Sequence, residues 1–158
     1  MFNKKQPLSF QEVLLKLMRY CSYQERSSFE VKQKLREYAL PADKVEEIMD
    51  LLVDDNFIDE DRFAALFVRG KVKVKRWGVY KIREGLSRKG VSSDEMAKAI
   101  ATIDQETYIE NLNYLVDRKL DLSREHGEDI SKMYRYLKSK GYEGDKISKV
   151  LRNKMLMT

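Results

Sequence analysis

A short, strongly basic window in the middle of the chain carries the residue types best suited to bind a polyanion. Residues 69–89 hold nine Lys or Arg side chains and one acidic side chain, a net charge of +8, whereas the whole 158-residue chain has a net charge of +5. Lys and Arg neutralise phosphates, and interleaved aromatic rings can stack on unpaired bases. The window therefore predicts a surface that contacts nucleic acid or an acidic protein. Its residues are Arg69, Lys71, Lys73, Lys75, Arg76, Trp77, Tyr80, Lys81, Arg83, Arg88 and Lys89.

A charge run of this kind can also be a solvated helix face with Trp77 and Tyr80 in the core. The concentration of charge favours a binding function for the window as a whole, but for Trp77 alone packing is the preferred interpretation, because aromatic side chains commonly anchor cores. Two weaker basic clusters, at residues 32–36 and 134–140, are balanced by nearby acids and are interpreted as solvated faces. If they join the site, a concave surface of repeated units could carry a discontinuous basic stripe.

Residues that support catalysis or metal binding are scarce. His126 is the single histidine and Cys21 the single cysteine, so the chain can assemble neither a zinc site nor an internal disulfide. His126 lies in a polar connection and is expected to be exposed, whereas Cys21 follows an apolar helix face and is expected to be buried. No P-loop, dinucleotide-binding or nucleophile-elbow motif occurs, and the acids at 54–61 fit a solvated turn and a helix N-terminus. We expect no enzyme activity, no metal and no cofactor.

The composition favours a helical protein in aqueous surroundings. Hydrophobic residues make up 42% of the chain and charged residues 36%, while seven Gly and two Pro are too few for a β-sandwich or barrel. No apolar run approaches the roughly 18 residues of a membrane span, and no secretory signal is recognisable. The sequence predicts a cytoplasmic protein that does not contact a membrane.

The elements that position the basic window follow from an internal repeat with an offset of fifty-one residues. An internal repeat of this length is typical of an array of like units and not of one enzyme core with a single cleft. The matching apolar positions are Val31, Leu35, Leu40 and Ile48 in the first copy, Ile82, Leu86, Val91 and Ala99 in the second, and Met133, Leu137, Tyr142 and Val150 in the third.

Each copy predicts a helix-turn-helix pair preceded by a longer helix. Ser27 and Glu30 form a capping box ahead of the first pair, and the equivalents of Ser27, Gly78 and Asp129, are also N-cap residue types. Gly90 ends the equivalent helix in the second copy and Gly141 ends it in the third, at a position where a left-handed residue is expected. The predicted fold is all-α, with three tandem three-helix repeats in an elongated array, straight or curved. The predicted boundaries are a disordered arm at 1–7 and repeats at 8–55, 56–104 and 105–158.

One segment of the window does not fit a helix pattern. Residues 70–75 alternate Lys and Val with a period of two, which is typical of a strand. A single strand without a partner is not a stable element. We therefore predict that this segment is the frayed end of the preceding long helix, passing into a loop before Gly78.

The order of residues around the window resembles the RecX family of bacterial recombination regulators. The resemblance rests on the run from Phe57 to Ala64, on residues 67–69, and on Trp77 through Val91. It is strongest between residues 20 and 100. The resemblance implies an all-helical monomer that binds the RecA recombinase filament on DNA and dampens its ATPase, coprotease and strand-exchange activities. Among the matching positions, Arg62 and Arg69 are the expected contacts, and the Lys/Val alternation at 71–75 departs from the commoner family pattern.

Two other functions are compatible with the same residues. One is a stand-alone, sequence-nonspecific nucleic-acid-binding module that needs no protein partner, since each helix pair has helix-turn-helix character. The helix predicted over 94–103 carries Asp94, Glu95 and only Lys98, which argues against its insertion into a DNA groove. The other is a structural adaptor whose basic face serves solubility alone.

Overall fold

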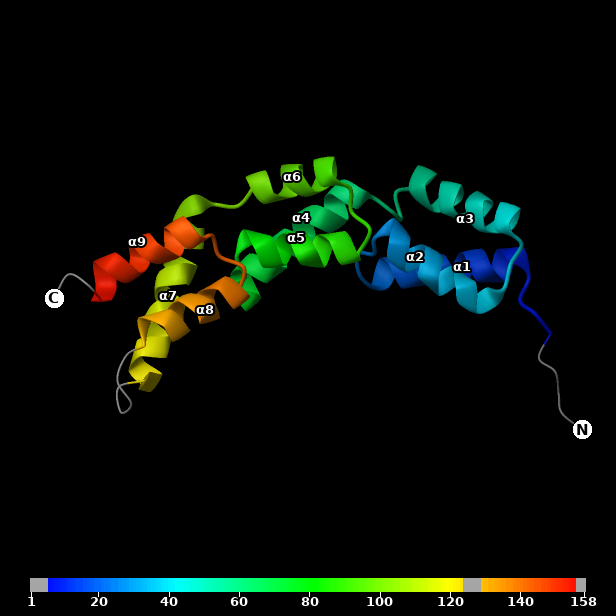
Figure 1. Ribbon diagram of the computed structural model, residues 1–158. Coiled ribbons are helices and arrows are strands. Elements are labelled where there is room, and N and C mark those ends of the chain that lie inside the picture. The colour runs from blue at the N-terminus through cyan, green and yellow to red at the C-terminus, as the bar shows by residue number, and fades with distance from the viewer. Residues whose placement is uncertain (1–5, 124–128, 156–158) are drawn as a thin grey trace, which may run out of the picture.

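The chain forms an all-helical array of three units that follow one another along a shallow arch (Figure 1). The computed structural model describes residues 6–123 and 129–155; most of the predicted N-terminal arm, residues 1–5, and His126 lie outside these ranges. No helix in the described ranges is long and apolar enough to cross a bilayer. The predicted all-α, three-repeat fold is confirmed. Its helices are α1 (Phe10–Tyr23), α2 (Ser28–Leu35), η1 (Arg36–Tyr38), α3 (Ala42–Asp54), α4 (Glu60–Gly70), η2 (Lys71–Lys75), α5 (Val79–Arg88), α6 (Ser93–Ala101), α7 (Gln105–Ser123), α8 (Ile130–Ser139) and α9 (Gly144–Met155).

The second helix of each unit begins at the residue that the repeat predicts. Ser27 caps α2 through a complete capping box with Glu30, and the Asp129 side chain accepts a hydrogen bond from the backbone of α8. Gly78 takes the same N-cap position ahead of α5 without a side-chain bond. Two of the three caps therefore use a side-chain oxygen, and the third needs another acceptor for the free N–H groups of its helix.

The acceptors lie at the end of α8, the second helix of the next unit. The Gly78 N–H donates to the Lys140 carbonyl at 2.8 Å, and the Tyr80 N–H donates to the Gly141 carbonyl at 3.0 Å. The unpaired N–H groups at the start of α5 thus satisfy unpaired carbonyls at the end of α8. In Figure 1 helices α2, α5 and α8 accordingly run roughly end to end along the arch.

The residue that ends each of these helices is left-handed, with φ of 50° at Ala39, 75° at Gly90 and 97° at Gly141. The two glycines also face a neighbouring unit closely. A Cβ on Gly90 would lie 2.8 Å from the Cβ of Phe29, and one on Gly141 would lie 2.5 Å from the backbone nitrogen of Lys81. Ala39 ends the equivalent helix of the first unit, which no earlier unit abuts, so the residue there has to tolerate only the backbone conformation.

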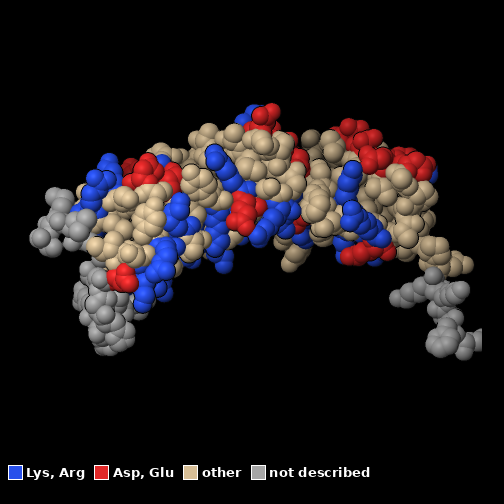
Figure 2. Space-filling model, in the orientation of Figure 1, with Lys and Arg blue, Asp and Glu red and all other residues tan. Residues whose placement is uncertain are grey.

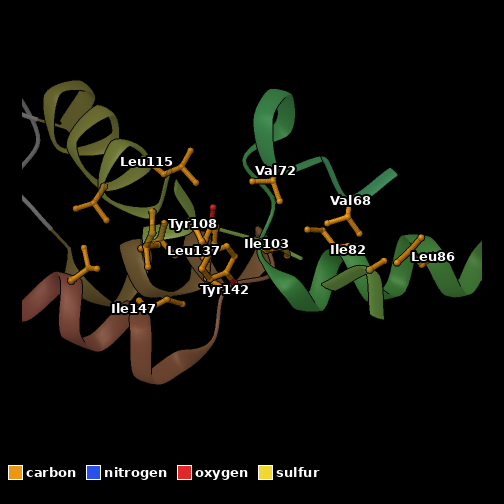
Figure 3. Close-up of a cluster of buried hydrophobic side chains, with 14 of the residues drawn as sticks. Val68, Val72, Ile82, Leu86, Ile103, Tyr108, Leu115, Leu137, Tyr142 and Ile147 are labelled. Atoms are coloured by element: carbon orange, nitrogen blue, oxygen red, sulfur yellow. The ribbon is translucent and has the colours of Figure 1, made fainter. Parts of the chain in front are cut away.

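The buried side chains form two separate clusters. One runs through α4–α9 and joins the second and third units, with Ile82, Leu86, Leu137 and Tyr142 fully buried (Figure 3). The other fills α1–α3 and its adjoining turn. Because burial of apolar area is the main source of stability, the second and third units should behave as one folding unit and the first as another.

Polar contacts join the first unit to the second. The Glu60 carboxylate, at the start of α4, accepts from the Ser28 N–H at the start of α2. Arg62 Nε donates to the Glu25 carboxylate, and Lys89 Nζ lies 3.4 Å from the Glu30 carboxylate. The acids predicted as a solvated turn and N-terminal helix charges therefore include one, Glu60, that caps a helix of another unit.

The segment predicted to fray into a loop is instead a π-helical turn, η2, which continues α4. The Val72 carbonyl, in the last turn of this helix, accepts a hydrogen bond from Asn111 Nδ2 of α7 at 2.9 Å. Val72 is buried against the core, while Val74 is 72% exposed. The prediction was wrong because a contact from the third unit, distant in sequence, holds the turn together.

Candidate nucleic-acid interface

The charges of the array are unevenly distributed over its surface. Figure 2 shows Asp and Glu side chains gathered along the outer edge over α3, whereas Lys and Arg side chains follow α2, α5 and α8 across the face and toward the inner edge. In α5, Ile82 and Leu86 point into the core, so Arg83 and Arg88 are left exposed. The helical period of α5 therefore places its apolar side chains in the core and its arginines on the exposed face.

The aromatic residue at the centre of the window, Trp77, packs against the core and against Phe67, with ring centres 6.5 Å apart. The ammonium groups of Lys71 and Lys81 lie 4.6 Å and 4.8 Å from the centre of its ring. These are cation–π distances, so the ring positions two of the cations of the window. The preferred interpretation of Trp77 as a packing residue agrees with this arrangement.

Arg69 and Lys73 lie on a different side of η2. They border a pocket of about 300 Å³ whose wall includes the apolar Val68, Val72 and Ile103 and also Asp104, whose carboxylate accepts hydrogen bonds from Thr107. Across the described residues neither cation has an ion-pair partner. The two charges are therefore available to an anionic partner beside an apolar surface.

Three predicted contact residues have partners within the protein. Arg62 joins the first unit to the second through Glu25, and its Nη2 also donates to the Asn56 carbonyl at 2.8 Å. Lys89 serves the same junction through Glu30, and Arg88 pairs with Glu84 one turn earlier on α5. These contacts give Arg62 and Lys89 a role in holding the array together.

Lys75 and Arg76 lie in a cleft of about 440 Å³ that opens between η2, α7 and α8. The Arg76 guanidinium carbon stacks 3.9 Å from the centre of the Tyr114 ring. On α8, the Tyr136 ring holds Lys119 Nζ at 4.6 Å and Lys140 Nζ at 5.9 Å from its centre. Arg118 completes the cationic lining.

The α7 part of this cleft was not predicted from the sequence. Tyr114, Arg118 and Lys119 lie 25 to 30 residues beyond the window, on a helix whose register departs from the repeat and whose charges are mixed with acids. The spacing of Tyr136 and Lys140 could have indicated this part of the site, but the basic cluster at residues 134–140 was interpreted as a solvated face. Only the packing of the second unit on the third brings the two sets together.

A buried polar network supports the wall of the cleft. The Tyr142 hydroxyl donates to the Arg76 carbonyl at 2.7 Å and holds Arg76 in its left-handed conformation. The Val79 N–H donates to the Tyr108 hydroxyl at 3.0 Å, and that hydroxyl donates to Glu143. Burial raises the pKa of both tyrosines. Burial also opposes ionisation of Glu143, but hydrogen bonds from Lys146 and Tyr108 outweigh it and hold its pKa below the usual range.

Cys21 is buried in the first unit with 7% of its surface exposed, as predicted. Burial raises the pKa of its thiol to about 11, so the reactive thiolate is suppressed at neutral pH. Over residues 6–123 and 129–155, no group of three or more His, Cys, Asp or Glu side chains could hold a metal ion.

Three RecX domain models match the chain in order. The first three-helix domain matches residues 14–52, the second 59–100 and the third 106–151. The regulatory protein RecX of Clostridium botulinum strain Eklund 17B is 35% identical over 127 residues, which cover 78% of this chain and 59% of that protein. The regulatory protein RecX of Lactococcus lactis strain SK11 is 28% identical over 130 residues, covering 78% and 48%. The chain thus spans about half to three fifths of the length of these relatives.

Solved structures show the same architecture. The crystal structure of RecX from Lactobacillus salivarius superimposes with a TM-score of 0.83 at 25% identity, covering 94% of this chain and 97% of that one. A second crystal structure, of a regulatory protein RecX, gives a TM-score of 0.81 at 24% identity and covers 89% and 70%. The three-unit array is therefore shared over nearly the whole described chain.

Proposed function

Because the chain belongs to the RecX family of regulatory proteins, we propose that it binds the RecA recombinase filament on DNA and inhibits or modulates its ATPase, coprotease and strand-exchange activities. The cationic face of the array carries this proposal. A filament of protein wound on DNA presents a long, grooved surface with exposed phosphates, and an elongated basic array can contact such a surface at several points at once.

The proposed role needs no catalytic group on this chain. Binding that favours one state of a filament shifts the population of that state, and the change in ATP hydrolysis follows from the shift. Arg69, Lys73, Lys75 and Arg83 are exposed and make no ion pair in the part of the chain that the structure describes. These are the side chains that we propose as contacts, together with the lysines that Trp77 positions.

The test measures ATP hydrolysis by RecA on single-stranded DNA with the protein added at concentrations comparable to RecA. We expect inhibition by the unaltered chain and at least tenfold weaker inhibition by the triple variant Lys73→Glu, Lys75→Glu, Arg76→Glu. Each reversal replaces an attraction to phosphate by a repulsion, worth about 1 kcal/mol or more at a partly screened surface. Circular dichroism should show an unchanged helical content.

A matched control reverses three exposed cations outside the window, Lys16, Arg19 and Lys98. Both triple variants change the net charge by the same amount, so only the position of the charge differs. Equal inhibition by the two variants would remove the window from the site. No inhibition by the unaltered chain would overturn the filament role itself.

A further inference from the structure

We infer that the cleft between η2, α7 and α8 binds a segment of single-stranded nucleic acid directly, without a protein partner. This site goes beyond the proposed filament role, because most of its cations lie outside the basic window and because binding there requires no RecA. The cations that line it are Lys75, Arg76, Arg118, Lys119 and Lys140.

The lining of the cleft is strongly cationic. Five cations border the cleft, and no carboxylate is among its lining residues. Asp117, which precedes Arg118 in the sequence of α7, has both carboxylate oxygens 2.7 Å from Lys154 Nζ and is therefore already paired. Like charges held close together repel, and a bound chain of phosphates would relieve that repulsion. The cleft therefore favours a polyanion.

Two tyrosines lie among these cations. Tyr114 is 43% exposed, carries Arg76 on its ring and receives a hydrogen bond from Arg118 at 3.4 Å. Tyr136 carries two lysines on its ring. A guanidinium stacked on a ring offers a flat surface on which an unpaired base can lie, and such stacking is typical of single-strand sites. A surface that contacts only the phosphates of a duplex needs no such rings.

Hydrogen bonds from buried and neighbouring side chains hold the cleft in a fixed shape. One wall is set by the buried Tyr142, which bonds the Arg76 carbonyl, and by Asn111, which bonds the Val72 carbonyl within η2. The cationic groups therefore project from a supported turn and two helices, and less side-chain freedom is lost on binding. The volume of about 440 Å³ falls within the range of pockets that enclose small organic groups, which makes room for a nucleotide.

An acidic protein segment is the competing occupant. Carboxylates would satisfy the same cations, but they would make no use of the exposed Tyr114 ring or of Val74, which is 72% exposed at the mouth. Each nucleotide supplies an anionic phosphate and a flat base in one ligand. The observations therefore favour a nucleic-acid strand, and the protein alternative becomes an outcome of the test.

The test uses the full chain, no RecA, and fluorescence anisotropy of a labelled oligothymidylate of roughly 16 nucleotides, about the upper site size of a single-strand-binding module. The variant Arg118→Glu, Lys119→Glu should weaken binding at least tenfold and flatten its dependence on salt. Its control, Lys16→Glu, Arg19→Glu, makes the same change in charge on exposed positions of α1 and should change binding less than threefold. Tyr114→Ala should weaken binding of the oligothymidylate more than binding of a duplex of equal length.

Thermal unfolding checks each variant, and Arg118→Gln, Lys119→Gln replaces the reversal if that variant does not fold. Equal affinity of the cleft variant and its control would overturn the inference, as would tighter binding of the duplex than of the single strand. If the cleft variant loses inhibition of RecA but keeps its affinity for the oligonucleotide, the cleft faces a protein and the inference is wrong. The oligonucleotide result stands apart from the filament assay, so the two proposals can fail separately.

Discussion

Replacement of Gly78 by alanine probes the junction between the second and third units more sharply than any core mutation. Gly78 has φ −82° and ψ 170°, a conformation that alanine adopts without strain. Its Cβ, however, would lie 2.3 Å from the Gly141 carbonyl carbon and 2.4 Å from both the Gly141 oxygen and the Tyr142 nitrogen. All three are backbone atoms, so no side-chain rotation can relieve the clash.

The cost follows from the contacts that must open. Ordinary contact between carbon atoms needs about 3.5 Å, so the two backbones must separate by about 1 Å. That movement stretches the Gly78–Lys140 and Tyr80–Gly141 hydrogen bonds, now 2.8 Å and 3.0 Å, beyond bonding range. Loss of each bond, with a partly buried group left unpaired, costs about 1–2 kcal/mol. We expect Gly78→Ala to lower the free energy of unfolding by about 3 kcal/mol.

Gly70→Ala is the matched control. A Cβ on Gly70 would meet no atom within 4 Å, and the residue is helical with φ −64° and ψ −42°. Alanine should therefore raise the free energy of unfolding by up to about 1 kcal/mol. Urea denaturation followed by circular dichroism measures both variants, and hydrogen exchange of α5 and α8 amides locates the loss. A midpoint for Gly78→Ala at or above that of the unaltered chain would refute the reasoning.

Three further predictions concern the first unit and the buried titratable groups. Arg62→Ala should lower the free energy of unfolding by about 1–2 kcal/mol because it breaks the contact with Glu25. Arg62→Lys should recover only part of that free energy. Equal hydrogen exchange of α1–α3 in the unaltered protein and both variants would contradict this prediction. Cys21, with its pKa raised by burial to about 11, should be alkylated far more slowly in the native than in the denatured protein at pH 8. Burial also raises the pKa of Tyr108 and Tyr142. The free energy of unfolding should therefore be at its full value below the ordinary thiol pKa of 9.0 and should fall as the pH rises toward 11. Constant denaturation midpoints from pH 8 to 11 would contradict these raised pKa values.

The helices themselves were predictable because their determinants are local. Ser27 and Glu30 lie three residues apart and cap one turn, and the apolar stripe of α5 repeats within ten residues. Such features depend on neighbours in sequence, and the constant offset of fifty-one residues copies them three times. The turn at 71–75 could not be predicted in the same way, since the side chain that bonds its Val72 carbonyl, Asn111, belongs to another unit.

The basic window was predictable for a similar reason: it is a run of cations that is contiguous in sequence. The partners of those cations were not, because each cation acquires its environment from a helix elsewhere in the chain. Lys89 meets Glu30 across a junction, Lys71 and Lys81 meet one indole, and Arg76 meets Tyr114. A single charge cluster in the sequence therefore becomes several surfaces with different chemistry.

The sequence by itself determined the helical repeat, the buried positions and the sign of the charge in the middle unit, because hydrophobic period, capping and residue charge are properties of short stretches. The tertiary structure decided how the units meet: through a shared core and backbone bonds between the second and third, and through ion pairs between the first and second. It also decided that five cations and two tyrosines from separate helices share one cleft. The physical reason is that close approach of chain segments distant in sequence depends on shape and packing, which no local pattern records.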